Sequence, residues 1–130
     1  MGRSAPRKQK RLVVHLMGVV AIIASGCGSP FDDQSFSKRA WAGATAEQRA
    51  VMAEDLVTNH VSPGMSSKQI VSLLGEPGEV WVKGSGFRVK GERTFVYYIG
   101  SWSLQGMDDA FVCVHLDETG SVLEAEIHGF

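Results

Sequence analysis

The chain has 130 residues, of which 44% are hydrophobic, and it carries 13 basic against 14 acidic side chains, a formal net charge of −1 at pH 7. This length and composition allow one globular domain. Five of the basic side chains fall within residues 1–11, so residues 27–130 hold eight basic and 14 acidic side chains, a net charge of −6. An acidic domain argues against nucleic acid as a partner and against membrane binding through a basic surface.

The first 26 residues have the pattern of a secretory signal. A basic segment at 1–11 precedes the apolar run LVVHLMGVVAIIA at 12–24. This run is too short to cross a bilayer, because a spanning helix needs about 20 apolar residues. We therefore expect residues 1–26 to be removed from the exported protein.

The end of this signal resembles that of a bacterial lipoprotein. The small residues Ser25 and Gly26 precede Cys27, which the resemblance implies is lipidated and anchors the chain to a membrane. Ala24 and His15 depart from the usual lipoprotein pattern. The alternative is ordinary cleavage after the small residues, which would leave a soluble protein with an unmodified cysteine.

The second cysteine is expected to be an inert thiol. Cys113 lies in the apolar strand pattern AFVCVHL, which favours burial over a nucleophilic role. A lipidated Cys27 would leave it without a disulfide partner. The other possibility, a Cys27 to Cys113 bridge, would tie a flexible segment to a strand.

Residues 27–42 are expected to form a tether, followed by a domain over 43–130. The tether is rich in Gly, Ser, Pro and Asp, and its aromatic side chains Phe31, Phe36 and Trp41 are expected to dock on the domain. The domain opens with a Thr45 to Gln48 capping box, which predicts a helix running to about His60.

A second helix is predicted within GMSSKQIVSLLGEPG at 64–78. Ser66 and Gln69 form another capping box, Met65 precedes the cap, and Gly75 with Pro77 ends the helix. The stretch lacks the G-K-[ST] of a phosphate-binding loop. Its glycines and serines therefore predict a structural motif rather than a phosphate site. The motif consists of Gly64, Met65, Ser66, Gln69, Leu74, Gly75 and Pro77.

The rest of the chain is typical of β-strands. Strands are predicted at 79–83, 87–100, 110–116 and 122–127, with a Gly-rich turn at 84–86 and a hairpin loop at 117–121. The expected fold is α+β, with two N-terminal helices packed on one side of a three- to four-stranded antiparallel sheet.

The element order and several phrases resemble the BamE (SmpA/OmlA) family, small outer-membrane lipoproteins of the β-barrel assembly machinery. The resemblance covers most of residues 31–127, and the chain is similar in particular to a group of short BamE-like bacterial lipoproteins. The phrases are FDDQSFSKRAW, QRAVMAEDL, GMSSKQIVSLLGEPGEVW, YYIG and DETGSVLEAEI. The resemblance implies the BamE and β-lactamase-inhibitor-protein fold and a location in the cell envelope, and it carries over no partner-binding residue.

No catalytic or metal-binding constellation is evident. Asp108 and Asp109 could be imagined with His115 as an acid-base or metal set, but adjacent residues of an extended chain point to opposite faces. His60 is better explained as a favourable charge at a helix end. We therefore expect no enzyme activity, no cofactor and no metal.

Aromatic residues crowd the strands, and two of them are candidates for partner binding. Phe95 and Tyr97 should share the face that packs on the helices, whereas Tyr98 points to the other face. Tyr98 and Trp102 in the open would make an aromatic patch suited to a protein partner. The alternative is that these aromatics fill the core or contact the tether.

The resulting functional hypothesis is a lipid-anchored periplasmic protein that binds envelope or outer-membrane assembly proteins. The alternative hypothesis is a secreted or anchored binding or inhibitor module of the same fold, unrelated to barrel assembly.

Overall fold

The structure, a computed structural model, describes residues 30–102 and 108–129. The expected signal and Cys27 lie outside these residues. The helical elements are α2 (Lys38–Ala42), α3 (Ala46–Ala50), α4 (Ala53–Asp55), the π-helical turn η1 (Leu56–His60) and α5 (Ser67–Leu74). The strands are β1 (Glu79–Val82), β2 (Arg93–Ser101), β3 (Asp109–Leu116) and β4 (Val122–His128).

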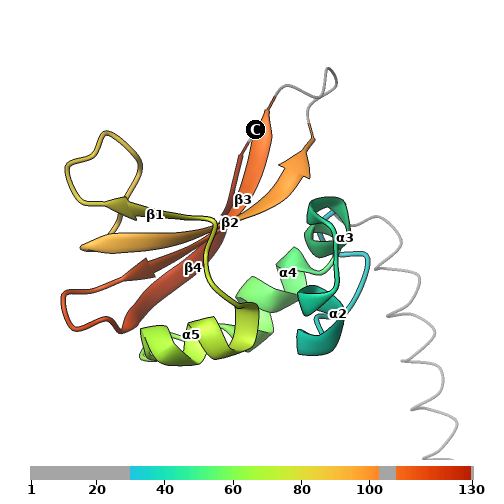
Figure 1. Ribbon diagram of the computed structural model, residues 1–130, viewed down its shortest axis with the longest axis horizontal. Coiled ribbons are helices and arrows are strands. Elements are labelled where there is room, and N and C mark those ends of the chain that lie inside the picture. The colour runs from blue at the N-terminus through green and yellow to red at the C-terminus, as the bar shows by residue number, and fades with distance from the viewer. Residues whose placement is uncertain (1–29, 103–107, 130) are drawn as a thin grey trace, which may run out of the picture.

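The strands form one antiparallel sheet in the order β1-β2-β3-β4, so the predicted α+β class with an antiparallel sheet is confirmed. Figure 1 shows the helices gathered on one side of the sheet, with the β2–β3 hairpin projecting beyond them. The strand predicted over 87–100 begins only at Arg93. Residues 83–92, which we call the strap, instead connect β1 to β2 through turns.

The main core lies between the helices and the sheet. Phe95, Tyr97 and Ile99 of β2 pack there with buried residues of the helices and of β3. Phe31 and Phe36 are buried in the same core and Trp41 of α2 has no exposed surface, so residues 31–42 belong to the packed unit. The three aromatic side chains of residues 27–42 thus pack on the domain, as expected from the sequence.

The single helix predicted from Thr45 to about His60 is wrong. Its capping box is present, but the helix breaks after α3 and ends in the π-helical turn η1. The segment before the helix competes for its backbone hydrogen bonds, because the N–H groups of Asp33 and Gln34 donate to the Val51 carbonyl. The Glu54 N–H in turn donates to the Phe31 carbonyl.

Helix α5 has the predicted ends. The Ser66 and Gln69 capping box is formed, and Gly75 has a φ of +83°. Two aromatic side chains satisfy carbonyls at its C-terminal end: Trp41 Nε1 donates to the Leu74 carbonyl at 3.0 Å and the Tyr97 hydroxyl to the Gly75 carbonyl at 2.9 Å. These two hydrogen bonds join the end of α5 to the core.

The segment before α5 is tied to the sheet. Gly64 N–H donates to the Val122 carbonyl, and Val122 N–H donates to the Met65 carbonyl, both at 2.8 Å.

Among the helices that the structure describes, none is long and apolar enough to cross a membrane.

Candidate functional site

The face of the sheet turned away from the helices carries its own side-chain cluster, because successive strand residues point to opposite faces. We call this the outer face. Its buried members are Trp81, Val96 and Cys113, packed with Val89 of the strap and Phe111 of β3. Burial, followed by the nearby Glu126 charge, raises the pKa of the Cys113 thiol to about 12. A thiol in this state is a poor nucleophile, and its burial agrees with the expectation from sequence.

The strap folds over part of the outer face. Phe87 stacks on Trp81 with ring centroids 4.7 Å apart and planes at 9°. Gly91 passes so close to β3 that a Cβ there would overlap the Leu116 carbonyl. An aromatic contact and a close backbone approach therefore help to hold the strap.

A buried histidine adds polar contacts between the strap and the sheet. His115 Nδ1 lies 2.7 Å from Thr94 Oγ1 and 3.3 Å from the Lys90 backbone N–H, which can only donate. Nδ1 is thus an acceptor, the imidazole proton sits on Nε2, and Nε2–H donates to Glu126 Oε1 at 3.1 Å. Every polar atom of the ring has a partner.

Lys90 closes this network from the solvent side. Its Nζ lies 2.7 Å from Glu124 and 2.8 Å from Glu126. Hydrogen bonds to Glu124 and then Glu126 raise the pKa of Lys90. Partial burial opposes ionisation of Glu126, but hydrogen bonds from Lys90 and His115 outweigh it and lower the pKa of this carboxyl.

The order Thr94, His115, Glu126 matches the nucleophile, base and acid of hydrolytic triads. Thr94 and His115, however, have no exposed surface, so a substrate cannot reach the hydroxyl. The arrangement attaches the strap to the sheet. Asp108 and Asp109 lie exposed near the start of β3, and Asp109 accepts a hydrogen bond from Ser101 at 2.7 Å.

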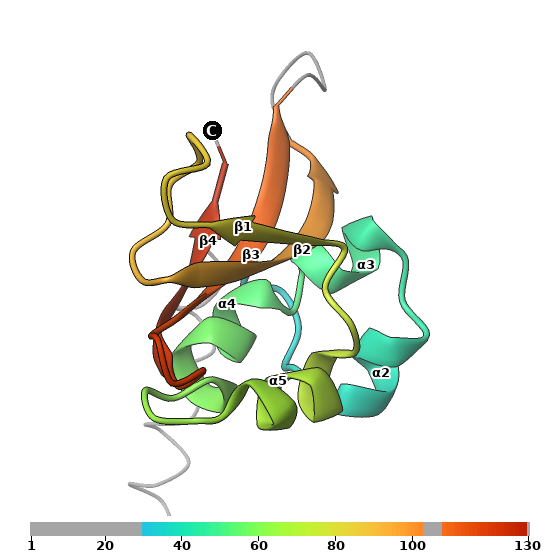
Figure 2. The ribbon, with the colours of Figure 1, turned by 60° about the vertical axis from the view of Figure 1, so that its left-hand side comes forward.

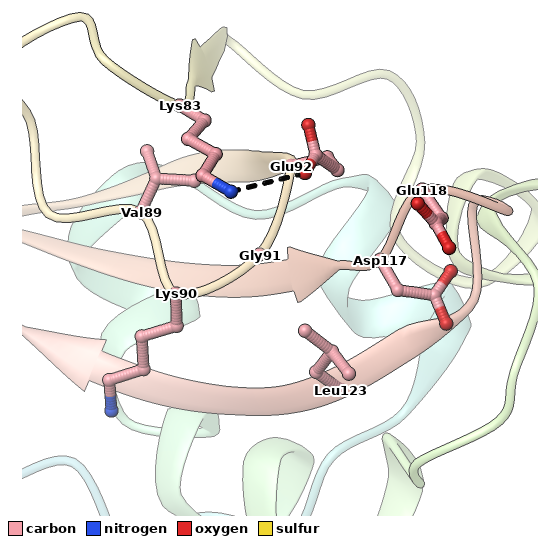
Figure 3. A pocket seen from close by; sticks show the side chains of 8 residues that line it. All are labelled: Lys83, Val89, Lys90, Gly91, Glu92, Asp117, Glu118 and Leu123. Carbon is pink, nitrogen blue, oxygen red and sulfur yellow. Dashed lines mark hydrogen bonds and ion pairs between the residues drawn. The ribbon is translucent and has the colours of Figure 1, made fainter.

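An open hollow of about 250 Å³ lies between the strap and the β3–β4 hairpin (Figure 3). Among its charged groups, Lys83 pairs with Glu92 at 3.4 Å, and Asp117 accepts from Thr119 and Ser121 in the hairpin turn. Those hydrogen bonds lower the pKa of Asp117. Across residues 30–102 and 108–129, no group of three or more His, Cys, Asp or Glu side chains could hold a metal ion.

The outer face also exposes aromatic surface. Phe87 is 57% exposed and Tyr98 is 43% exposed. Phe111 connects Tyr98 to Trp81, with its ring 5.7 Å from that of Trp81 and 5.8 Å from that of Tyr98. We call Trp81, Phe87, Tyr98 and Phe111 the outer aromatic patch. Such clusters of large aromatic side chains are typical of protein-binding surfaces.

The structure does not bring Tyr98 and Trp102 together in one patch. Trp102 is half-buried against the main core, where its ring meets Phe31 edge to face at 5.6 Å and Nε1 donates to the Ile99 carbonyl at 2.6 Å. The pairing of β2 with β3 shifts by one residue between Tyr98 and Ser101, which turns the next side chain to the opposite face. The outer aromatic patch therefore contains Phe87 in place of the expected Trp102.

Sequence reasoning missed the strap and its histidine network. The glycine at position 91 between two polar residues was the available signal against a continuous strand. His60, the other histidine considered, lies 3.1 Å from Asp55 at the end of η1.

Comparison of the chain with protein-family models, curated proteins and solved structures finds no match.

Proposed function

We propose that this chain is a non-enzymatic protein of the bacterial cell envelope, held on the periplasmic side of the outer membrane by lipid on Cys27. In this proposal it acts by binding another protein during outer-membrane assembly or maintenance, as members of the BamE family do. The BamE-like arrangement of helices on the sheet is part of the proposal.

The outer aromatic patch is the observation that carries a binding role. Phe87 and Tyr98 expose about half of their surface beside the buried Trp81, an arrangement in which a partner could cover apolar area already held in place. The hollow beside the strap offers a partner no comparable aromatic surface, because none of the residues that line it is aromatic.

The lipid anchor is supported by the sequence. Ser25 and Gly26 precede Cys27 after a basic and apolar signal. The acidic charge of residues 27–130 makes a lipid, rather than a basic surface, the means of membrane contact. Phrases such as GMSSKQIVSLLGEPGEVW connect the chain to the family by resemblance.

Intact mass and membrane partition of the protein expressed with its own signal test the anchor. We expect a diacyl or triacyl mass on the fragment that begins at Cys27, and loss of both the mass and membrane association in a Cys27→Ser variant. An unmodified, soluble wild-type protein would contradict the anchor. It would favour a secreted binding or inhibitor module of the same fold.

A further inference from the structure

The sheet has an edge strand, β1, whose sequence is self-complementary. β1 is the terminal strand of the sheet and pairs only with β2 among the described strands. At the opposite edge, the start of β4 is bonded to Gly64 and Met65. Figure 2 shows β1 crossing in front of the other strands, with the strap leaving its end.

Hydrogen bonding fixes which backbone groups of β1 face outward. Lys83 N–H donates to the Glu92 carbonyl at 3.0 Å, which continues the β1–β2 ladder by one residue. Because pairing alternates along an antiparallel strand, Trp81 and Glu79 also point their backbone groups at β2. Val80 and Val82 therefore direct theirs away from the sheet. The Val82 carbonyl also accepts from Ser85 N–H, and a carbonyl can accept a second hydrogen bond.

The side chains at this edge are apolar in the middle and charged at the ends. Val80 is 47% exposed and Val82 is 52% exposed. Glu79 and Lys83 flank them in the sequence E-V-W-V-K. An exposed edge strand with apolar side chains is a template for another strand.

We propose that β1 pairs antiparallel with β1 of a second copy of this chain, about a two-fold axis at Trp81. In this register Val80 of each copy lies opposite Val82 of the other, so outward-facing backbone groups meet. Glu79 of each copy then lies opposite Lys83 of the other. The two copies pair their outward-facing backbone groups through the same residues, as an isologous interface requires.

The charge pattern selects this register over its neighbours. A shift that sets Val80 opposite Val80 places Glu79 opposite Trp81, and one that sets Val82 opposite Val82 places Lys83 opposite Trp81. Only the register centred on Trp81 forms two opposite-charge pairs, and such cross-strand pairs stabilise antiparallel sheets. Glu79 Oε2 already accepts from Trp81 Nε1 at 2.8 Å, and a carboxylate has further acceptor sites for a lysine. Lys83 Nζ lies 3.4 Å from Glu92 in its own chain, and its ammonium group has three donors, so it can bond a second carboxylate.

A pairing this short belongs to the weak class of interfaces. The inference concerns the edge of β1 alone and depends neither on the lipid anchor nor on a partner at the outer aromatic patch. Two copies held on one membrane surface would meet at a raised effective concentration.

Sedimentation measurements test the pairing. They use the protein as processed by the cell, in mild detergent, from low to high micromolar concentration. We expect a reversible monomer–dimer equilibrium. Glu79→Lys and Lys83→Glu should each weaken it about tenfold, because two attractive pairs become repulsive. Glu118→Lys makes the same charge change on the β3–β4 hairpin and should leave the dissociation constant unchanged.

Restoration of the dimer distinguishes this interface from any other. The double variant Glu79→Lys/Lys83→Glu should dimerise again, and an equimolar mixture of the two single variants should form mixed dimers. Both results also exclude misfolding of the single variants. A wild-type protein that stays monomeric, or a dimer that Glu79→Lys leaves unweakened or the double variant fails to restore, would overturn the proposal.

Discussion

The ring of Phe87 lies flat against that of Trp81, with centroids 4.7 Å apart, and this contact fixes the strap to the first strand of the sheet. Phe87 keeps 57% of its surface exposed, whereas Trp81 beneath it keeps 7%. Phe87 therefore both covers the cluster on the outer face and presents aromatic surface to solvent.

Replacing Phe87 by Ala should loosen the strap without unfolding the sheet. We expect a loss of about 1 kcal/mol in the free energy of unfolding, the usual worth of an aromatic pair. Amide hydrogen exchange should quicken in the strap, including at the Lys90 N–H that donates to His115. Tyr98→Ala, on the same face, should leave strap protection unchanged. Equal exchange in both variants would contradict a holding role for Phe87.

His115 should stabilise the fold far more than His60 does. His115→Ala leaves the buried Thr94 hydroxyl without its ring partner and opens a cavity, so we expect a loss of about 3 kcal/mol in urea unfolding. His60 contacts Asp55 near the surface, so His60→Ala should cost less than about 1 kcal/mol. Similar losses for the two variants would show that the buried network contributes little.

The contacts of Lys90 should make stability depend on pH in two ranges. The pKa of Glu126 is lowered in the folded state, so its contribution is present above the unfolded value of 4.5 and is lost as pH falls through the folded pKa. The pKa of Lys90 is raised, so its contribution is present below 10.5 and is lost as pH rises through the folded pKa.

Urea unfolding of wild type and Lys90→Met across pH measures this dependence. The difference in unfolding free energy should be steady near neutral pH and should shrink both in acid and in strong base. A difference that is the same at all pH values would show that Lys90 acts through packing of its methylenes alone.

Gly75→Ala should destabilise the protein by about 1–2 kcal/mol, because Gly75 has a φ of +83° that side-chain-bearing residues adopt only with strain. No atom within 4 Å would clash with the new methyl group, so the loss reports the backbone alone. Gly43 has a φ of −96° and equally open surroundings, so Gly43→Ala should be neutral or slightly stabilising. Thermal unfolding compares the two, and equal effects would refute the argument from φ.

Local signals predicted the ends of helices well and long-range contacts poorly. The capping boxes at Thr45 and Ser66 depend on side chains three residues apart, and both are present. The break within residues 45–60 depends instead on hydrogen bonds with Phe31 and Asp33, which precede the helix. Helical periodicity contains no information about such a competing partner.

In the candidate site, too, local signals predicted side-chain positions better than long-range features did. Alternation along β2 placed Tyr98 on the outer face, where it is 43% exposed. The one-residue shift before Ser101 then reversed the alternation and sent Trp102 to the core. Gly100, with a φ of +102°, marks this irregularity in the sequence, but a single glycine does not reveal the direction in which a neighbour turns.

The most direct test of the proposed function is photo-crosslinking in cells, with a photoreactive residue at position 98 in the outer aromatic patch. The matched control carries the same residue at position 118 on the exposed β3–β4 hairpin. We predict that position 98 crosslinks to one or more proteins of outer-membrane assembly, that position 118 does not, and that Phe87→Ala reduces the product. Absence of a product specific to position 98 would contradict a binding role for the outer aromatic patch.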